Sequence, residues 1–160
     1  MYLIFYGIYK KQSCGDTMGV IVMDEEWVEF YDENAEPTLL IIGVNNDRSQ
    51  HMGWELAYLG YRVVMTEEND DIGQAIYDIM PNLILMDYSM EARAKGITPR
   101  HIMRYLAGDA PGCHPPLVVI AEPQMRHEIP EGVAIYAVLL PTSLDVLSAV
   151  VREHVTVEML

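Results

Sequence analysis

From Thr38 onward, short runs of apolar residues alternate with segments in which apolar residues recur every three or four positions. The runs, such as TLLIIGV and PLVVIA, are continuous, as in strands that are buried on both faces of a sheet. The segments between them carry helix signals: Asp70 or Asp71 is a candidate N-cap of one, and Thr98 followed by Pro99 begins another. This order predicts a parallel sheet with helices on both faces.

The strands are expected at 38–44, 61–66, 82–87, 116–121 and 134–140, and the helices at 49–60, 70–80, 98–108 and 143–155. Between the last two strands, Pro123 and Pro130 bound only six residues, which leaves room for one or two helical turns or a loop. The predicted fold class is α/β, a flavodoxin-like doubly wound five-stranded parallel sheet. In such folds, function gathers at the carboxyl ends of the strands.

The first 37 residues differ from the rest. Two stretches rich in aromatic and β-branched residues flank the turn-like KKQSCGDT, which predicts a β-hairpin arm. The expected division is therefore an arm and linker at 1–37, a domain at 38–155 and a tail at 156–160. A lone hairpin is marginal in water, and this one carries many aromatic side chains. We expect the arms of two copies to pair in a homodimer; folding back onto the same domain is the alternative.

Size and charge exclude several classes. A chain of 160 residues suits one domain with a full core, and no apolar run reaches the length of a membrane span. The N-terminus makes a poor signal peptide, so we expect a cytoplasmic location, with Cys14 and Cys113 as free thiols. A net charge of −14 disfavours nucleic acid and anionic lipid as partners. Proteins with basic or apolar patches are the expected partners.

The stretches LLIIGVNNDRS, PNLILMDYSM and YAVLLPTSLDVL, within residues 38 to about 155, resemble the receiver domain of bacterial two-component response regulators. In that family the third strand ends in the aspartate that is phosphorylated in a phosphorelay, and the resemblance places Asp87 at this position. It also implies magnesium held near two acids that end the first strand, a Ser or Thr that ends the fourth and a Lys that ends the fifth. Magnesium is needed because the phosphoryl group carries several negative charges.

In this sequence the supporting positions are occupied by other residues. The acid pair maps onto Gly43 and Val44, the hydroxyl onto Ala121 and the Lys onto Leu140. We therefore expect a degenerate receiver of pseudo-receiver type, in which the Asp87 carboxylate has neither metal nor ammonium beside it. An acid at this place can also serve simply as a cap that accepts from the backbone of the following loop.

The leading hypothesis is an atypical receiver-like signalling module, not an enzyme, that acts by protein–protein interaction without cofactor or metal. Its partner would be a histidine kinase or a downstream signalling protein. One alternative is a functional phosphoacceptor that completes its site with Asp47 or Glu122. Another is a small-molecule-binding module, because the altered positions would make the strand-end crevice smaller and more apolar.

Two weaker signals concern a metal site and a cobalamin-binding loop. The histidines and cysteine of a metal hypothesis fit no usual zinc spacing. DRSQHMG faintly resembles the Asp-x-His-x-x-Gly loop of cobalamin-binding domains, but three residues separate Asp47 from His51 and one separates His51 from Gly53. GVNND has no glycine-rich phosphate cradle. The residues of the metal hypothesis are His101, Cys113, His114 and His127.

Overall fold

The computed structural model describes residues 3–4, 22–23, 26–27, 37–44, 47–66, 71–107, 114–132 and 135–155. Its elements are, in chain order, β1 (Leu3–Ile4), β2 (Val22–Met23), β3 (Glu26–Trp27), β4 (Thr38–Gly43), α1 (Asp47–Tyr58), β5 (Arg62–Met65), α2 (Ile72–Ile79), β6 (Leu83–Tyr88), α3 (Met90–Ala94), α4 (Pro99–Leu106), β7 (Leu117–Ala121), the 3-10 helix η1 (Pro123–Glu128), β8 (Ile135–Leu139) and α5 (Leu144–His154).

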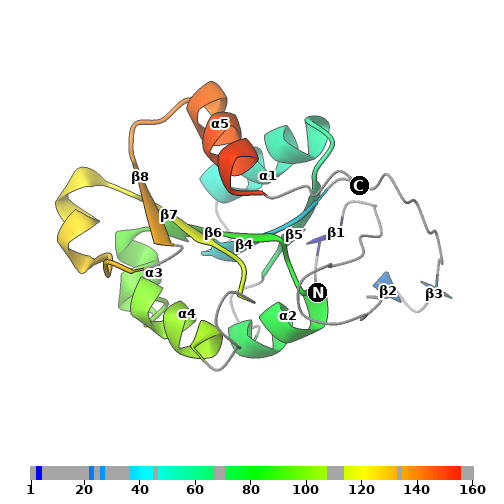
Figure 1. Ribbon diagram of the computed structural model, residues 1–160, viewed down its shortest axis with the longest axis horizontal. Coiled ribbons are helices and arrows are strands. Elements are labelled where there is room, and N and C mark those ends of the chain that lie inside the picture. The colour runs from blue at the N-terminus through cyan, green and yellow to red at the C-terminus, as the bar shows by residue number, and fades with distance from the viewer. Residues whose placement is uncertain are drawn as a thin grey trace.

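The central sheet has the strand order β1-β5-β4-β6-β7-β8. The five strands from β4 to β8 are parallel to one another, whereas β1 joins the outer edge of β5 in the antiparallel sense. The first strand of the parallel set, β4, lies inside the sheet, so the chain winds outward in both directions from it (Figure 1). This is the doubly wound flavodoxin-like sheet that the alternating pattern predicts.

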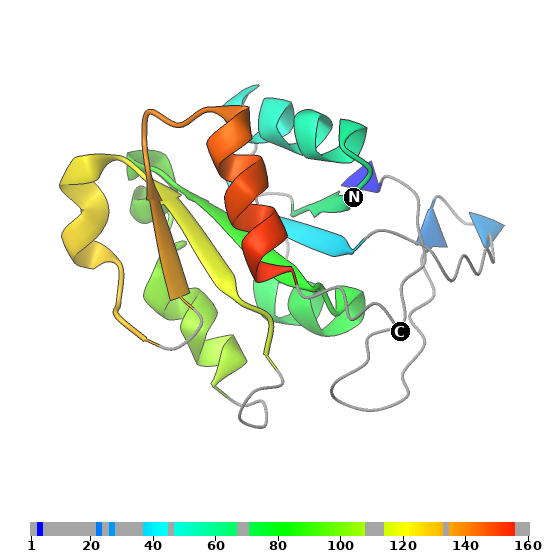
Figure 2. The same ribbon diagram turned by 45° about the horizontal axis from the view of Figure 1, so that its top comes forward.

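Helices cover both faces of this sheet, with α1 and α5 on one side and α2, α3 and α4 on the other (Figures 1 and 2). All six residues of β4 and all six of β6 are buried, which explains their continuous apolar runs. Alternate residues of each strand contribute to two separate clusters. The cluster under α1 and α5, here called the α1/α5 core, includes Ile41, Leu85, Ile120 and Leu147. The α2/α4 core on the other face includes Ile42, Met86, Ile102 and Tyr88.

Local signals place the helix ends. The Asp71 side chain accepts a hydrogen bond from the Gln74 N–H, and the Thr98 hydroxyl accepts one from the His101 N–H, so both predicted caps are confirmed. Gly60, at the end of the first predicted helix range, 49–60, has φ +101°, which suits a residue that follows a helix end. One element was not predicted: α3 begins after Ser89, whose hydroxyl accepts from the Ala92 N–H at 3.1 Å. Between the last two strands, where one or two helical turns or a loop were expected, the chain forms η1.

The described part of the N-terminal region differs from the predicted arm. Leu3 pairs with Met65 and Ile4 with Val64, at the edge of the main sheet. The second aromatic stretch pairs within itself, because β2 and β3 form a separate two-stranded ribbon. The remaining residues of 1–36, with Cys14, and the tail 156–160 lie outside the described residues, so the arm as a unit stays a prediction. None of the helices in the described ranges is long and apolar enough to cross a membrane.

Candidate functional site

Asp87 lies at the carboxyl end of β6 and is 1% exposed. In the sheet register it is opposite Gly43 of β4 and Ile120 of β7. Since side chains alternate along a strand, Asp87 shares its face with Leu85 and lies on the side covered by α1 and α5. The chain thus holds a carboxylate beneath α1, at the edge where the sequence placed the phosphoacceptor position.

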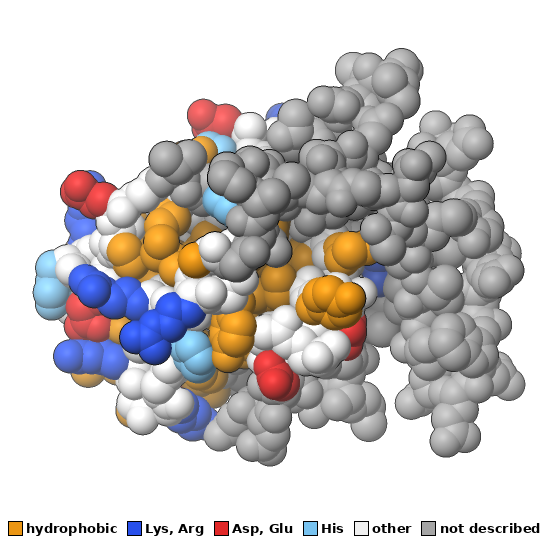
Figure 3. All heavy atoms as spheres, turned by 60° about the horizontal axis from the view of Figure 1, so that its bottom comes forward, with side chains coloured by type: hydrophobic (Ala, Val, Ile, Leu, Met, Phe, Trp, Pro, Cys, Tyr) orange, Lys and Arg blue, Asp and Glu red, His pale blue; other side chains and the backbone are white. Residues whose placement is uncertain are grey.

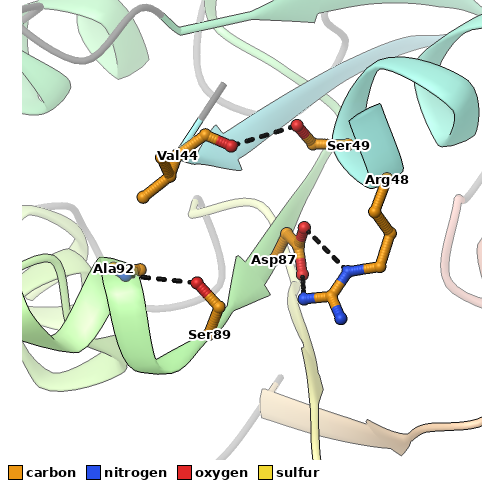
Figure 4. Close-up of polar contacts among 6 residues, drawn as sticks. All are labelled: Val44, Arg48, Ser49, Asp87, Ser89 and Ala92. Atoms are coloured by element: carbon orange, nitrogen blue, oxygen red, sulfur yellow. Dashed lines mark hydrogen bonds and ion pairs between the residues drawn. The ribbon is translucent and has the colours of Figure 1, made fainter. Parts of the chain in front are cut away.

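Arg48, in the first turn of α1, forms a two-pronged ion pair with this carboxylate (Figure 4). Its Nε donates to Asp87 Oδ2 at 3.2 Å, and its Nη2 donates to Asp87 Oδ1 at 2.5 Å. The Arg48 side chain is 40% exposed, so the guanidinium covers the acid from the solvent side. Such bidentate pairing engages both carboxylate oxygens in one fixed geometry.

The expectation that neither metal nor ammonium lies beside Asp87 did not consider a guanidinium. That expectation rested on the Lys position at the end of β8, the fifth parallel strand. It overlooked Arg48, which follows β4, the first parallel strand. One signal could have found it. The carboxyl ends of neighbouring parallel strands meet at one edge, so the first turn of the helix after β4 starts near the end of β6. The capping interpretation of Asp87 is not what the described contacts show either, because Ser89 caps the following helix.

Gly43 lets β4 approach this site closely. A Cβ atom at Gly43 would lie 3.1 Å from the backbone oxygen of Asp87 and 3.2 Å from its Cβ. Both distances are tighter than ordinary carbon contacts. The first acid position of the family is thus filled by a residue without a side chain, and a carboxylate there would crowd Asp87.

The other three substituted positions lie in apolar surroundings. Val44 and Ala121 belong to the α2/α4 core, on the face opposite Asp87. The backbone oxygen of Val44 accepts from the Ser49 hydroxyl at 3.1 Å, which ties the end of β4 to α1 (Figure 4). Leu140 packs against the α1/α5 core, on the same face as Asp87, and its peptide bond to Pro141 is cis.

The two acids of the alternative phosphoacceptor hypothesis lie at the margin of the site. Asp47 is the first residue of α1 and is exposed. Glu122 follows β7, is partly exposed, and accepts a hydrogen bond from the Gln124 side chain. Both acids lie on the strand-end side of the sheet, as the phosphoacceptor hypothesis requires. The described contacts of Asp87, however, are with Arg48 and not with either acid.

Tyr88, the neighbour of Asp87, points to the other face and fastens η1. Its hydroxyl donates to Glu128 Oε2 at 2.5 Å, and Glu128 Oε1 pairs with Arg93 of α3 at 3.2 Å. Burial raises the pKa of Tyr88 to about 12, with a further contribution from the hydrogen bond to Glu128 and its negative charge, while Arg93 opposes the shift. The end of β6 is thus linked to α1 on one face and to η1 on the other.

The metal and cobalamin hypotheses gain no support from the geometry. His101 contacts the Gly96 carbonyl and the Tyr105 hydroxyl, and His51 pairs with Glu55 one turn away on α1. Cys113 lies outside the described residues. Within the described ranges, no group of three or more His, Cys, Asp or Glu side chains could hold a metal ion.

Comparison with known proteins identifies the fold. The NMR structure of the pseudo-receiver domain of the CikA protein matches this chain with a TM-score of 0.52 and 14% sequence identity, over 76% of this chain and 99% of that domain. No protein-family model matches the sequence, and no curated protein matches it either. The chain therefore shares the receiver-like doubly wound fold of that domain, as the sequence predicted.

Proposed function

We propose that this chain is a receiver-like signalling module that works by binding a protein partner, and that the Arg48–Asp87 ion pair holds its strand-end site in one state. The observation that carries the proposal is that both oxygens of the buried acid accept hydrogen bonds from a guanidinium. The match to a pseudo-receiver fold supports the proposal of a signalling module. The ion pair supports the proposal that phosphate does not switch it.

The electrostatic reason is that Arg48 provides the positive charge that magnesium provides in the receiver family. A guanidinium stays protonated at any physiological pH, so this charge is permanent. Magnesium prefers six oxygen ligands, and here one described carboxylate faces the site with both oxygens already engaged. Binding of the metal would require Arg48 to leave a buried partner, which is unfavourable.

The contacts on the far side of β6 support a surface of fixed shape. Tyr88, Glu128 and Arg93 connect β6, η1 and α3 through one short hydrogen bond and one ion pair. These contacts oppose motion of η1 relative to β6. On this proposal the partner recognises a constant surface.

The test exposes the full chain to the phosphate donor and the metal that a receiver domain uses. Acetyl phosphate with magnesium should add no mass at Asp87, and magnesium at several times the usual cellular level should leave the amide NMR shifts around Asp87 unchanged. Capture of a partner from native lysate should be the same with and without the phosphate donor. The matched variant is Asp87→Asn, which keeps the size of the side chain and an acceptor for Arg48.

A phosphoryl mass on the wild-type chain that disappears in Asp87→Asn would contradict the proposal and favour the phosphoacceptor alternative. So would partner capture that requires the phosphate donor. A saturable magnesium shift centred on Asp87, without phosphorylation, would show that Arg48 does not keep the site closed to cations.

A further inference from the structure

Positive charge is gathered on one face of an acidic chain. The sequence has 10 Lys and Arg residues against 24 Asp and Glu. Five of the ten lie on or beside α3, α4 and η1, on the side of the sheet opposite α1 and α5. Figure 3 shows Lys and Arg side chains clustered at one end of this side, with His and acidic side chains beside them. This cluster is called the basic face here; its residues are Arg93, Lys95, Arg100, Arg104 and Arg126.

Arg93 pairs with Glu128 and Lys95 with Glu91 on the same face, so the charge available to a partner is that of the other three arginines. Arg100, Arg104 and Arg126 are exposed, and no ion pair joins them to another described residue. Arg100 and Arg104 are four residues apart on α4, where like charges face the same side and repel each other. Neither arginine is needed to fill a core. Their charge is therefore free to meet acids of another chain.

The chain itself contains a segment of the opposite charge. Residues 24–36 include seven acids and neither Lys nor Arg. The segment contains β3, which forms a two-stranded ribbon with β2. In Figures 1 and 2 this ribbon lies at the far end of the molecule from α3 and η1. The acids are Asp24, Glu25, Glu26, Glu29, Asp32, Glu33 and Glu36.

We propose that the basic face binds the acidic segment 24–36 of a second copy of this chain, and that two such contacts close a dimer. The ribbon's position away from its own basic face favours a contact between copies. Each copy offers one acidic segment and one basic face, so a two-fold arrangement satisfies both at once. Complementary charge also gives two chains of net charge −14 a local attraction that their overall repulsion would otherwise prevent.

The first experiment is sedimentation equilibrium of the full chain over a range of concentrations. The wild-type chain should dimerise at about 0.05 M salt and dissociate at about 0.5 M, because exposed charges are screened over a shorter distance at high salt. Arg104→Glu should raise the dimer Kd at least about tenfold. Arg152→Glu on α5 changes the net charge equally but lies off the basic face, and should leave the Kd within about twofold.

The second experiment exchanges the charges. One variant, Arg100→Glu/Arg104→Glu, loses most of the positive charge of the face and keeps the acidic segment; the other, Glu25→Lys/Glu26→Lys, keeps the basic face and loses part of the negative charge of the segment. Each alone should dimerise more weakly than the wild type, whereas an equal mixture should form heterodimers, since the unchanged basic face of one variant meets the unchanged acidic segment of the other. Circular dichroism melting curves confirm that each variant folds.

Three outcomes would overturn the proposal. They are a wild-type chain that is monomeric at every concentration, a face variant that dimerises as the wild type does, and a mixture that fails to associate. If a monomeric wild-type chain instead binds a short DNA duplex and the face variant does not, the basic face is a site for phosphate backbones and the dimer is rejected.

Discussion

Two charged side chains are buried at opposite ends of the sheet, and their surroundings differ. At the carboxyl end, Asp87 is fully enclosed and paired through both oxygens with Arg48. At the amino end, Arg62 of β5 is 5% exposed, and its Nη1 donates to the Thr38 hydroxyl at 3.2 Å. Among the described residues, the Arg62 Nε is buried without a hydrogen-bond partner. One end therefore has a neutralised charge, and the other has a charge that no described acid neutralises, called the isolated charge here.

The difference shows which buried charge is part of a site. Taking a charge out of water costs free energy, and only a partner of opposite charge with good geometry offsets most of it. Asp87 has such a partner, whereas Arg62 has a neutral hydroxyl among the described residues. Desolvation accordingly lowers the pKa of Arg62 from its ordinary value to about 10. Breaking the pair and removing the isolated charge should have opposite effects on stability.

The largest effect is expected from Arg48→Met. This change leaves the Asp87 carboxylate buried without its partner and should lower the free energy of unfolding by about 2 kcal/mol, below the usual range for buried pairs because Arg48 is half-exposed. The double variant Arg48→Met/Asp87→Leu should recover most of the loss, since an apolar pair replaces the ionic one. Urea denaturation measures all three chains.

Arg152→Met on the surface of α5 is the matched control and should change stability by less than about 0.5 kcal/mol. If Arg48→Met and the double variant lose the same amount, the two side chains are not energetically coupled. The ion pair would then have no role in holding the strand-end site.

A smaller effect of opposite sign is expected from Arg62→Met. Methionine keeps a buried apolar stem but removes the desolvated charge, so the free energy of unfolding should rise by about 1 kcal/mol. Thermal and urea denaturation both report it. A loss of stability instead would mean that Arg62 has a counter-charge outside the described residues, and the contrast between the two ends would disappear.

The smallest effect is a pH dependence. Because burial lowers the pKa of Arg62 to about 10 in the folded chain, below its value in the unfolded one, the unfolded state binds more protons as the pH passes 10, and stability attributable to Arg62 rises with pH. Between pH 9 and 11 the stability of the wild-type chain relative to Arg62→Met should increase by about 1 kcal/mol.

Comparing the two chains is necessary in that pH experiment because Tyr88 titrates in the same range with the opposite sign. Its pKa is raised to about 12, so the folded state holds its proton longer, and its contribution to stability is lost as the pH rises from 10 toward 12. Tyr88 is present in both chains, so its effect cancels in the difference. A constant difference between the chains would show that Arg62 is not desolvated as described.

Most of the fold from Thr38 onward could be predicted from local sequence patterns. The five strands, the caps at Asp71 and Thr98 and the place of Asp87 at a strand end depend on residues within a few positions of one another. The short α3 was missed because its five residues are too few to show a period. The pairing of β1 with β5 was missed because two residues carry no register signal, whereas the aromatic content suggested a local hairpin.

The sequence by itself determined the α/β fold class, the order of elements and the buried position of Asp87, because apolar periodicity and capping act over short distances along the chain. Only the tertiary structure decided what stands beside that acid. Arg48 is 39 residues away, and it reaches Asp87 because β4 and β6 are hydrogen-bonded neighbours whose carboxyl ends meet at one edge. The basic face likewise exists only because α3, α4 and η1 pack on the same side, where charges dispersed along an acidic sequence come together.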